Sequence, residues 1–204
     1  MNFSLMKSHW VPRSIQVLLP LFVFLASCGP RAQAPDPGDS PEQVASLYDY
    51  DVETRVTELG IGLTEPGKPV ANYVSAVRSG NLVFMSGKGP SKPEGGFVTG
   101  KVGAELTLEE GYAAARLAAI AQLSALKAEI GDLNRVVRIV KVTGMVNADP
   151  FFTGHSQVIN GFSDLMVEVF GERGKHARAA VGMSSLPLGF AVEVEMVVEV
   201  QPAG

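Results

Sequence analysis

Cysteine and histidine, the side chains that most often supply nucleophiles and metal ligands, are scarce in this sequence of 204 residues. Cys28 is the single cysteine, and the histidines are His9, His155 and His176. One cysteine cannot close an internal disulfide, and no later cysteine can supply a catalytic thiolate or a metal-binding pair. His155 and His176 stand at no spacing to carboxylates that is typical of a metal site. We therefore expect no metal and no other cofactor.

The surroundings of Cys28 predict a different use for its thiol. Residues 1–27 contain two basic residues and no acidic one, with the apolar stretch 17–25 followed by small residues. This is the layout of a secretory signal segment, and its ending Leu25-Ala26-Ser27-Cys28 resembles a bacterial lipobox, in which the cysteine is lipidated. The alternative is an ordinary signal peptide with a chance cysteine. A membrane-spanning helix fits less well, because the apolar stretch is about half the ~20 residues needed.

Cleavage before Cys28 would remove the signal segment and make Cys28 the first residue of the mature protein. We expect export and a lipid anchor, as its only membrane association, in a bacterial cell envelope. Gly29 after the cysteine favours the outer membrane, on its periplasmic side. Loss of residues 1–27 leaves 177 residues and changes the formal net charge from −4 to −6. Such an acidic chain argues against general nucleic-acid binding.

The mature part divides into a tether and one domain. Residues 29–41 are rich in proline, alanine, glycine and aspartate, so we expect a tether that reaches at most about 40 Å. The predicted parts are a signal peptide (1–27), a lipid-attached tether and lead-in (28–50) and a single domain (51–204). A short helix is predicted within 43–59, where Gly60 would end it.

The domain shows alternating signals for strands and helices. Ser79-Gly80-Asn81 separates two apolar runs and predicts a hairpin. Thr107 and Glu110 form a capping box that opens a helix, and Gly131 would end it. The predicted strands are 74–78, 82–86, a short 97–99, 135–146, 177–183 and 190–200, and the predicted long helices are 107–131 and 154–170. This order favours an α+β fold, a mixed sheet with two helices packed on one face.

Periodicity also predicts which side chains face the core. The first long helix should bury Ala113, Leu117, Ile120, Ser124 and Leu126. The second long helix should bury Val158, Phe162, Leu165, Met166 and Val169. The last strand should place Val192, Val194, Met196, Val198 and Val200 on one face and Glu193, Glu195 and Glu199 on the other.

Four short motifs occur in order along this domain. They are Asn72-Tyr73-Val74, Ser86-Gly87, Ala177-Arg178-Ala179-Ala180-Val181 and Val192-Glu193-Val194-Glu195. Together they resemble, over about residues 70–200, the RidA/YjgF family of reactive-intermediate imine deaminases, also called endoribonuclease L-PSP or chorismate-mutase-like proteins. The resemblance implies a chorismate-mutase-like α+β fold. It also implies a homotrimer whose sheets form a barrel, with active sites in the clefts between subunits.

The resemblance further implies hydrolysis of small enamines and imines of 2-amino acids to 2-keto acids and ammonia. Arg178 matches the family's arginine, whose planar guanidinium suits bidentate binding of a substrate carboxylate. Glu193 matches the glutamate that positions or activates the attacking water. Backbone groups around Ala180 would polarise the imine nitrogen. Three more side chains match residues that line the family's pocket: Tyr73, Ser86 and Asn160.

The sequence departs from the family pattern at three places. Because of these departures, the family's fold can be transferred to this chain more readily than the family's substrate. His176 replaces the usual proline two residues before the arginine, and Ala180 replaces the common cysteine two residues after it. Lys88-Gly89-Pro90 replaces the common glutamine after Ser86-Gly87 and leads into a longer loop. That loop lacks the spacing of a phosphate-binding loop. The changes resemble a less studied branch of the family.

Plainer interpretations stay open for each residue and for the whole protein. Arg178 and Glu193 could be solvated strand side chains, and Ser86 a hydroxyl at a strand end. A protein that binds small carboxylates without turnover is the alternative function, because enzymes that make 2-aminoacrylate are expected inside the cell. RNA cleavage ranks third, since the chain is acidic and lacks a histidine acid/base pair.

Overall fold

The computed structural model describes residues 46–67 and 71–202. The signal segment, Cys28 and the tether therefore lie outside the described residues, as does the start of the helix predicted in 43–59. No helix in these two ranges is long and apolar enough to cross a membrane.

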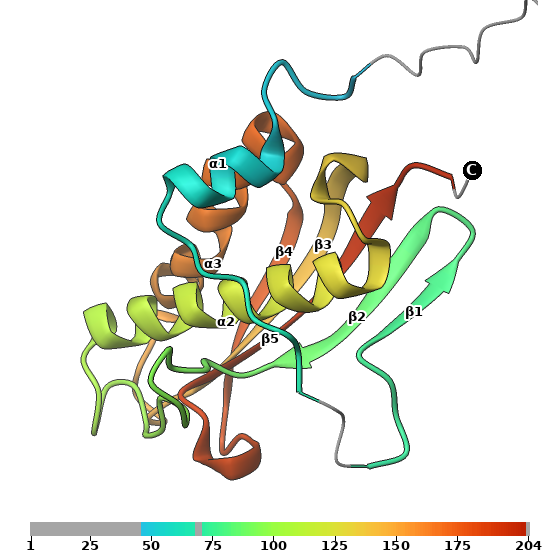
Figure 1. Cartoon of the computed structure of the whole chain (residues 1–204). Helices are drawn as coiled ribbons and strands as arrows, with labels where there is room; N and C mark the ends of the chain where they lie inside the picture. The colour runs from blue at the N-terminus through green and yellow to red at the C-terminus, as the bar shows by residue number, and fades with distance from the viewer. Residues whose placement is uncertain (1–45, 68–70, 203–204) are drawn as a thin grey trace, which may run out of the picture. The chain divides into compact units, whose positions relative to one another are not determined.

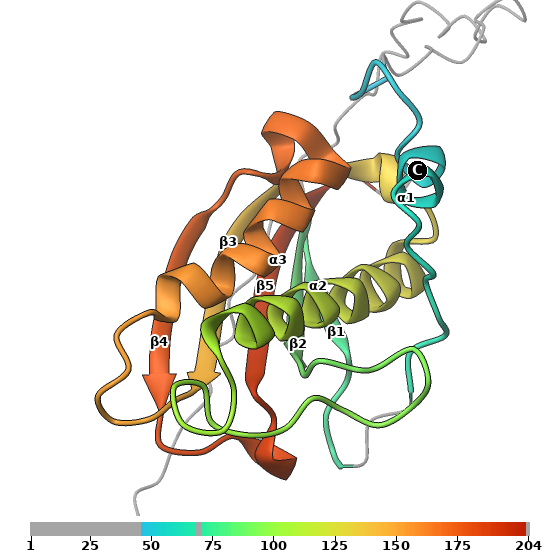
Figure 2. The same cartoon turned by 90° about the vertical axis from the view of Figure 1, so that its left-hand side faces the viewer.

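A five-stranded mixed sheet forms the centre of the domain (Figure 1). Its strand order is β1-β2-β5-β3-β4, in which only β3 and β4 run parallel. Helices α2 and α3 cover one face (Figure 2). The predicted α+β class is thus confirmed. The strands are β1 (Ala76–Ser79), β2 (Leu82–Lys88), β3 (Val136–Asn147), β4 (Ala177–Met183) and β5 (Val192–Val200). The helices are α1 (Val52–Glu58), α2 (Leu108–Ile130) and α3 (His155–Phe170), with 3-10 turns at Leu133–Arg135, Gly171–Gly174 and Pro187–Gly189.

The long helix α2 begins and ends at the predicted residues. Thr107 and Glu110 make the capping box, and Gly131 follows the last turn with φ 81°. The predicted inward face is correct in part: Ser124 and Leu126 are buried, Leu117 and Ile120 are partly buried, and Ala113 is exposed. The other buried residues of α2 are Gly111, Ala114, Ala115, Ala118, Ala119, Gln122, Leu123, Ala125 and Ile130. Alanines on several sides of this helix fit more than one inward face, so the sequence pattern did not select a single one.

Helix α3 buries the face that its sequence predicts. Val158, Phe162, Leu165, Met166 and Val169 are all fully buried. The crossing of α3 with α2 is close at Gly161, where an added Cβ would overlap the carbonyl of Tyr112. Large side chains on one face and a glycine at the crossing therefore fix α3 firmly over the sheet.

The sheet has one covered face and one open face. On β5 the predicted alternation is confirmed, because Val192, Val194, Met196, Val198 and Val200 are buried against the helices. Phe84 of β2 and Val181 of β4 are exposed, and both lie on the opposite face by register. The face that a residue occupies can therefore be read from its register partner across the sheet.

The short strand predicted at 97–99 is wrong. Phe97 and Thr99 make only isolated bridges, to Ser91 and Phe190. Gly95, Gly96 and Gly100 flank the segment with φ of 100°, 75° and 122°, a conformation that does not continue a strand. The segment is a loop held by single bridges.

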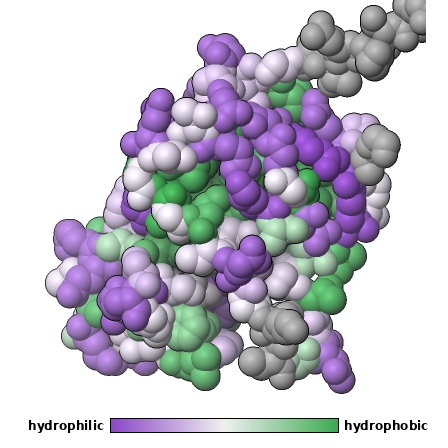
Figure 3. All heavy atoms as spheres, viewed as in Figure 1, coloured by the Kyte–Doolittle hydropathy of each residue, from purple (hydrophilic) through white to green (hydrophobic). Residues whose placement is uncertain are grey.

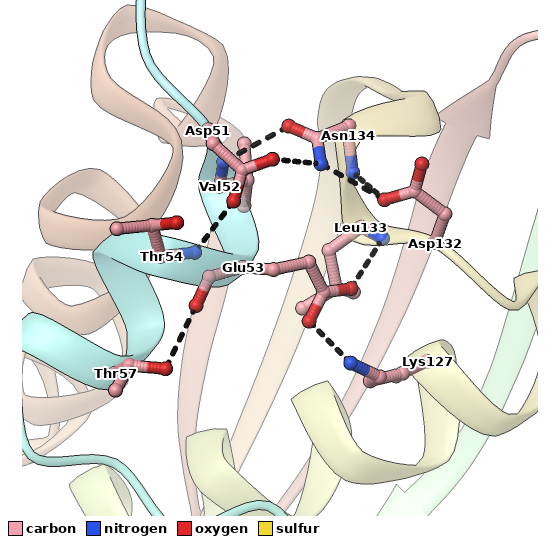
Figure 4. Close-up of polar contacts among 9 residues, drawn as sticks. All are labelled: Asp51, Val52, Glu53, Thr54, Thr57, Lys127, Asp132, Leu133 and Asn134. Carbon is pink, nitrogen blue, oxygen red and sulfur yellow. Dashed lines mark hydrogen bonds and ion pairs between the residues drawn. The ribbon is translucent and has the colours of Figure 1, made fainter.

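Helix α1 ties the beginning of the domain to the junction between α2 and β3 (Figure 4). Asp51 caps α1 by accepting from Thr54 N at 2.7 Å, and its other oxygen accepts from Asn134 Nδ2 at 2.9 Å. Glu53 accepts from Leu133 N at 3.0 Å and pairs with Lys127. The helix predicted within 43–59 begins only at Val52, and residues 46–51 are not helical.

Candidate functional site

Arg178 lies on β4 and faces the helices. It pairs in register with Val142, which is fully buried on the covered face. Its Nη1 donates to Asn160 Oδ1 and to Ser163 Oγ, both at 2.9 Å, and Nη2 reaches Ser156 O at 3.4 Å. All three acceptors belong to α3. The guanidinium is therefore held against this helix by directed hydrogen bonds.

The hydrogen bonds of Arg178 leave one edge of its guanidinium unused. Arginine has five N–H donors, and the contacts within the described part of the chain engage three of them. The remaining donors are Nε–H and one Nη2–H, on the two nitrogens that form the edge facing away from Nη1. A planar carboxylate can accept both at once, so this edge has the geometry of a carboxylate clamp.

His176 and Ser163 extend the hydrogen bonds behind Arg178. The Nδ1 of His176 lies 2.7 Å from Gly174 O, and its Nε2 lies 3.0 Å from Ser163 Oγ. These distances fit a neutral ring that donates to Gly174 O and accepts from the Ser163 hydroxyl, which in turn accepts from Arg178. Burial lowers the pKa of His176 and Arg178 adds to this effect, while the Gly174 hydrogen bond opposes it.

We call this cluster the arginine half-site: Asn160, Ser163, His176, Arg178 and Ala180. Ala180 lies on the same face of β4 as Arg178, two residues further along, and pairs in register with Gly144. The structure thus brings together three of the predicted site residues, Asn160, Arg178 and Ala180. Ser163 was missed, although its spacing of three residues from Asn160 on a helix already places both on one side.

Glu193 lies on the opposite face of the sheet from Arg178. It pairs in register with Met145, which pairs in turn with Val181 of β4. Val181 is three residues after Arg178, so the two side chains of β4 point to opposite faces. Within one chain the sheet therefore separates the two predicted catalytic residues.

The carboxylate of Glu193 lies against the backbone of β2. A Cβ added at Gly87 would overlap Glu193 Oε1, so only glycine leaves room for the carboxylate there. Burial raises the pKa of Glu193, and repulsion by Glu195 raises it further. Among the described residues no hydrogen bond to this carboxylate offsets the burial. Glu193 is therefore a half-buried acid whose pKa is raised above its ordinary value.

Ser86 directly precedes Gly87 on β2. Its hydroxyl donates to Val74 O at 2.7 Å, and its N donates to Ser75 O at 3.0 Å. These bonds hold the segment next to Tyr73, whose side chain is 53% exposed and makes no hydrogen bond with Glu193 within the described residues. We call this cluster the glutamate half-site: Ser86, Gly87, Glu193 and Glu195. Gly87 was missed as a functional residue, although it stands inside the motif that predicted Ser86.

Comparisons with known proteins agree with this architecture. Residues 53–200 match the family described as "YjgF/chorismate mutase-like, putative endoribonuclease". Protein TCP17 of Trypanosoma cruzi is 49% identical over 149 residues, which cover 72% of this chain and 93% of TCP17.

Two crystal structures are similar over nearly their whole length. The protein Atu1372 of Agrobacterium tumefaciens, whose function is unknown, is 42% identical with a TM-score of 0.68 and covers 74% of this chain and 94% of its own. A Shewanella oneidensis MR-1 protein described as a "putative endoribonuclease" is 32% identical with a TM-score of 0.71 and covers 74% of this chain and 100% of its own. The matched domain, the sheet order and the ordered motifs lead to one conclusion: the chain belongs to the RidA/YjgF family.

Proposed function

We propose that this protein hydrolyses small enamines and imines of 2-amino acids to 2-keto acids and ammonia. The reaction would take place where the arginine half-site of one copy meets the glutamate half-site of a neighbour in a homotrimer. The proposal combines the family membership of the chain with the separation of Arg178 and Glu193 by the sheet. Two half-sites on opposite faces of one chain can form a single pocket only when two copies meet.

The observation that carries the proposal is the unused edge of the Arg178 guanidinium. Asn160 and Ser163 occupy Nη1 and fix the plane of the group, so its free edge is presented without loss of side-chain entropy on binding. A 2-imino acid has a carboxylate adjacent to the reacting carbon. Binding that carboxylate at Arg178 would therefore set the position of the C=N bond.

Glu193 would supply the proton transfers of hydrolysis. A water molecule adds to the carbon of the protonated imine (C=NH2+), and one of its protons passes to the Glu193 carboxylate, which leaves a neutral carbinolamine. Glu193 then returns this proton to the amino nitrogen, and ammonia leaves as the C–N bond breaks, the C=O bond forms and the hydroxyl proton passes to solvent. A raised pKa suits both roles, because the group must accept and return a proton near neutral pH.

Ammonia release from enzymatically generated 2-aminoacrylate tests the proposal. We expect the full-length protein to accelerate the release and Arg178→Ala to lower kcat/KM by about a thousand-fold, since a charge-assisted bidentate contact is lost. Arg55→Ala is the matched control, because Arg55 is a surface arginine of α1. A wild-type rate equal to that of Arg178→Ala would contradict the proposal.

A carboxylate-binding protein without turnover is the second candidate. The separation of Arg178 and Glu193 favours this candidate. Within one chain, the free guanidinium donors of Arg178 can bind a carboxylate while Glu193 lies on the other face of the sheet. Calorimetry with pyruvate separates the two candidates. Binding that needs Arg178, without any ammonia release, would support this second function.

We also propose that Cys28 carries a lipid that anchors the protein in the cell envelope. The support is the signal segment that ends in Leu25-Ala26-Ser27-Cys28. Cys28→Ser should move the protein from the membrane fraction of the producing bacterium to the soluble fraction. Retention of the variant with membranes would contradict the lipid anchor.

A further inference from the structure

A cavity of about 540 Å³ lies on the helix-covered side of the sheet, separate from both half-sites. One wall is the outer side of α2, with Leu117, Ile120 and Ala121. The other walls are the segments 60–67 and 88–93. Figure 3, which views this side, shows apolar surface among polar side chains. The volume falls in the range of small-molecule sites, and the mixed lining suits a ligand with one apolar and one polar end.

Lys88 enters this cavity from β2. The register of β2 with β5 shifts between Met85 and Lys88, so that Lys88 pairs with Val194, a fully buried residue on the covered face. Lys88 therefore lies on the covered face, opposite the face on which Gly87 contacts Glu193. The bulge directs Lys88 away from the glutamate half-site and toward α2.

The ammonium group of Lys88 is only partly satisfied. Its Nζ donates to Ser75 Oγ at 3.2 Å, and none of the ion pairs within the described ranges involves Lys88. Burial lowers the pKa of Lys88, because desolvation makes its charged form less favourable. A half-buried charge without a counter-charge is unfavourable, and an anion beside it would remove that cost.

The other charges at the cavity leave it positive. Lys92 lies at the rim on the same loop, and Glu65 lies on the facing segment. Two lysines and one glutamate give the cavity lining a net positive charge, although the whole chain has a formal net charge of −4. Ser124, by contrast, builds the wall, because its hydroxyl donates to Ile120 O and accepts from Thr64 N.

We propose that this cavity binds a small amphipathic anion, a carboxylate or phosphate monoester with a short apolar body. The anionic head would lie beside Lys88, and the apolar body would lie along Leu117 and Ile120. The site stands on the covered face, so it does not depend on the proposed hydrolysis or on the assembly of copies. It gives a function to the Lys88-Gly89-Pro90 segment, which departs from the family pattern.

Binding is best measured with full-length Arg178→Ala protein, because the clamp that could also hold a carboxylate is then removed. The probes are hexanoate and hexyl phosphate, with hexanol and hexylamine as controls without negative charge. Calorimetry should show saturable binding of at least one anion with a dissociation constant below about 1 mM, and no binding of the controls. Methyl resonances of Leu117 and Ile120 should shift during the same titration.

Variants then assign the binding to Lys88. Lys88→Met keeps the apolar stem and should lower the affinity for the anion by about ten- to a hundred-fold. Lys175→Met is the control, because Lys175 is a surface residue paired with Glu172, and it should leave the affinity unchanged. Ala121→Phe should fill the cavity and abolish binding. Without ligand, Lys88→Met should unfold at the wild-type temperature or higher, because an uncompensated cation is gone. The proposal is overturned by the absence of saturable anion binding, or by equal affinity in Lys88→Met.

Discussion

The two half-sites differ in how their charged groups are held. Arg178 has directed acceptors on α3, and behind them a continuous series of hydrogen bonds reaches Gly174 O through Ser163 and His176. Glu193 is half-buried against Gly87, and its pKa is raised by desolvation. The first group is stabilised in its charged form and suits binding. The second is destabilised in its charged form and suits proton transfer.

In the proposed reaction, the two sides of the sheet therefore have separate tasks. The arginine half-site is rigid before any ligand arrives, since helix α3 fixes every acceptor. The glutamate half-site depends on Gly87, a backbone position without a side chain. Changes in the two half-sites should therefore affect different kinetic parameters.

Glu193→Gln should have the largest effect on the glutamate half-site alone. The amide keeps the shape but cannot accept a proton, so kcat should fall by about a hundred- to ten-thousand-fold while pyruvate affinity stays unchanged. A variant that loses affinity and rate together would show that Glu193 also contributes to binding. Steady-state kinetics measure kcat, and calorimetry measures the affinity for pyruvate.

The raised pKa of Glu193 also fixes the sign of a stability effect. The folded protein holds this proton more tightly than the unfolded chain, so the favourable contribution is present at low pH and is lost as pH rises through the folded-state pKa. Glu193→Gln should therefore gain thermal stability over wild type at pH 8 more than at pH 4. Equal differences at both values would contradict the raised pKa.

Gly87→Ala should produce an intermediate effect. The added Cβ overlaps the Glu193 carboxylate, so we expect about a ten- to hundred-fold lower kcat and a loss of about 1–3 kcal/mol in unfolding free energy. Gly62→Ala is the matched control, because no atom lies within 4 Å of its added Cβ. If Gly87→Ala instead weakened pyruvate binding and spared kcat, the division of tasks would be wrong.

Ser163→Ala should produce the smallest effect, confined to binding. Arg178 loses one acceptor and its link to His176 but keeps Asn160, so KM should rise by about three- to ten-fold at unchanged kcat. Ser156→Ala on the same helix is the control, because only the backbone carbonyl of Ser156 contacts Arg178. A fall in kcat without a change in KM would place Ser163 in the chemistry.

The elements with large side chains at a regular period could be predicted from the sequence. Helix α3 and strand β5 each have one face of bulky apolar residues, and both faces were correctly predicted. Helix α2 was predicted in extent but only partly in orientation, because alanines at neighbouring positions allow several faces. The loop at 97–99 has strand-forming residues, but the flanking glycines decide its backbone.

The sequence could not predict on which face of the sheet each candidate site residue lies. The run Ala177-Arg178-Ala179-Ala180-Val181 has no alternation of large and small residues, so nothing in it indicates the face of Arg178. Pairing with β3 determines that face, and β3 has two register shifts against β5. Such irregularities depend on the assembled sheet and leave no local signal.

The most direct test of the account asks whether the two half-sites of different copies form one active site. Arg178→Ala and Glu193→Gln chains with different affinity tags are co-expressed, and only oligomers that carry both tags are kept. Each mixed trimer contains one cleft in three with both residues intact, so ammonia release should return to about a third of the wild-type rate. A rate no higher than that of the separate variants would contradict a site shared between copies.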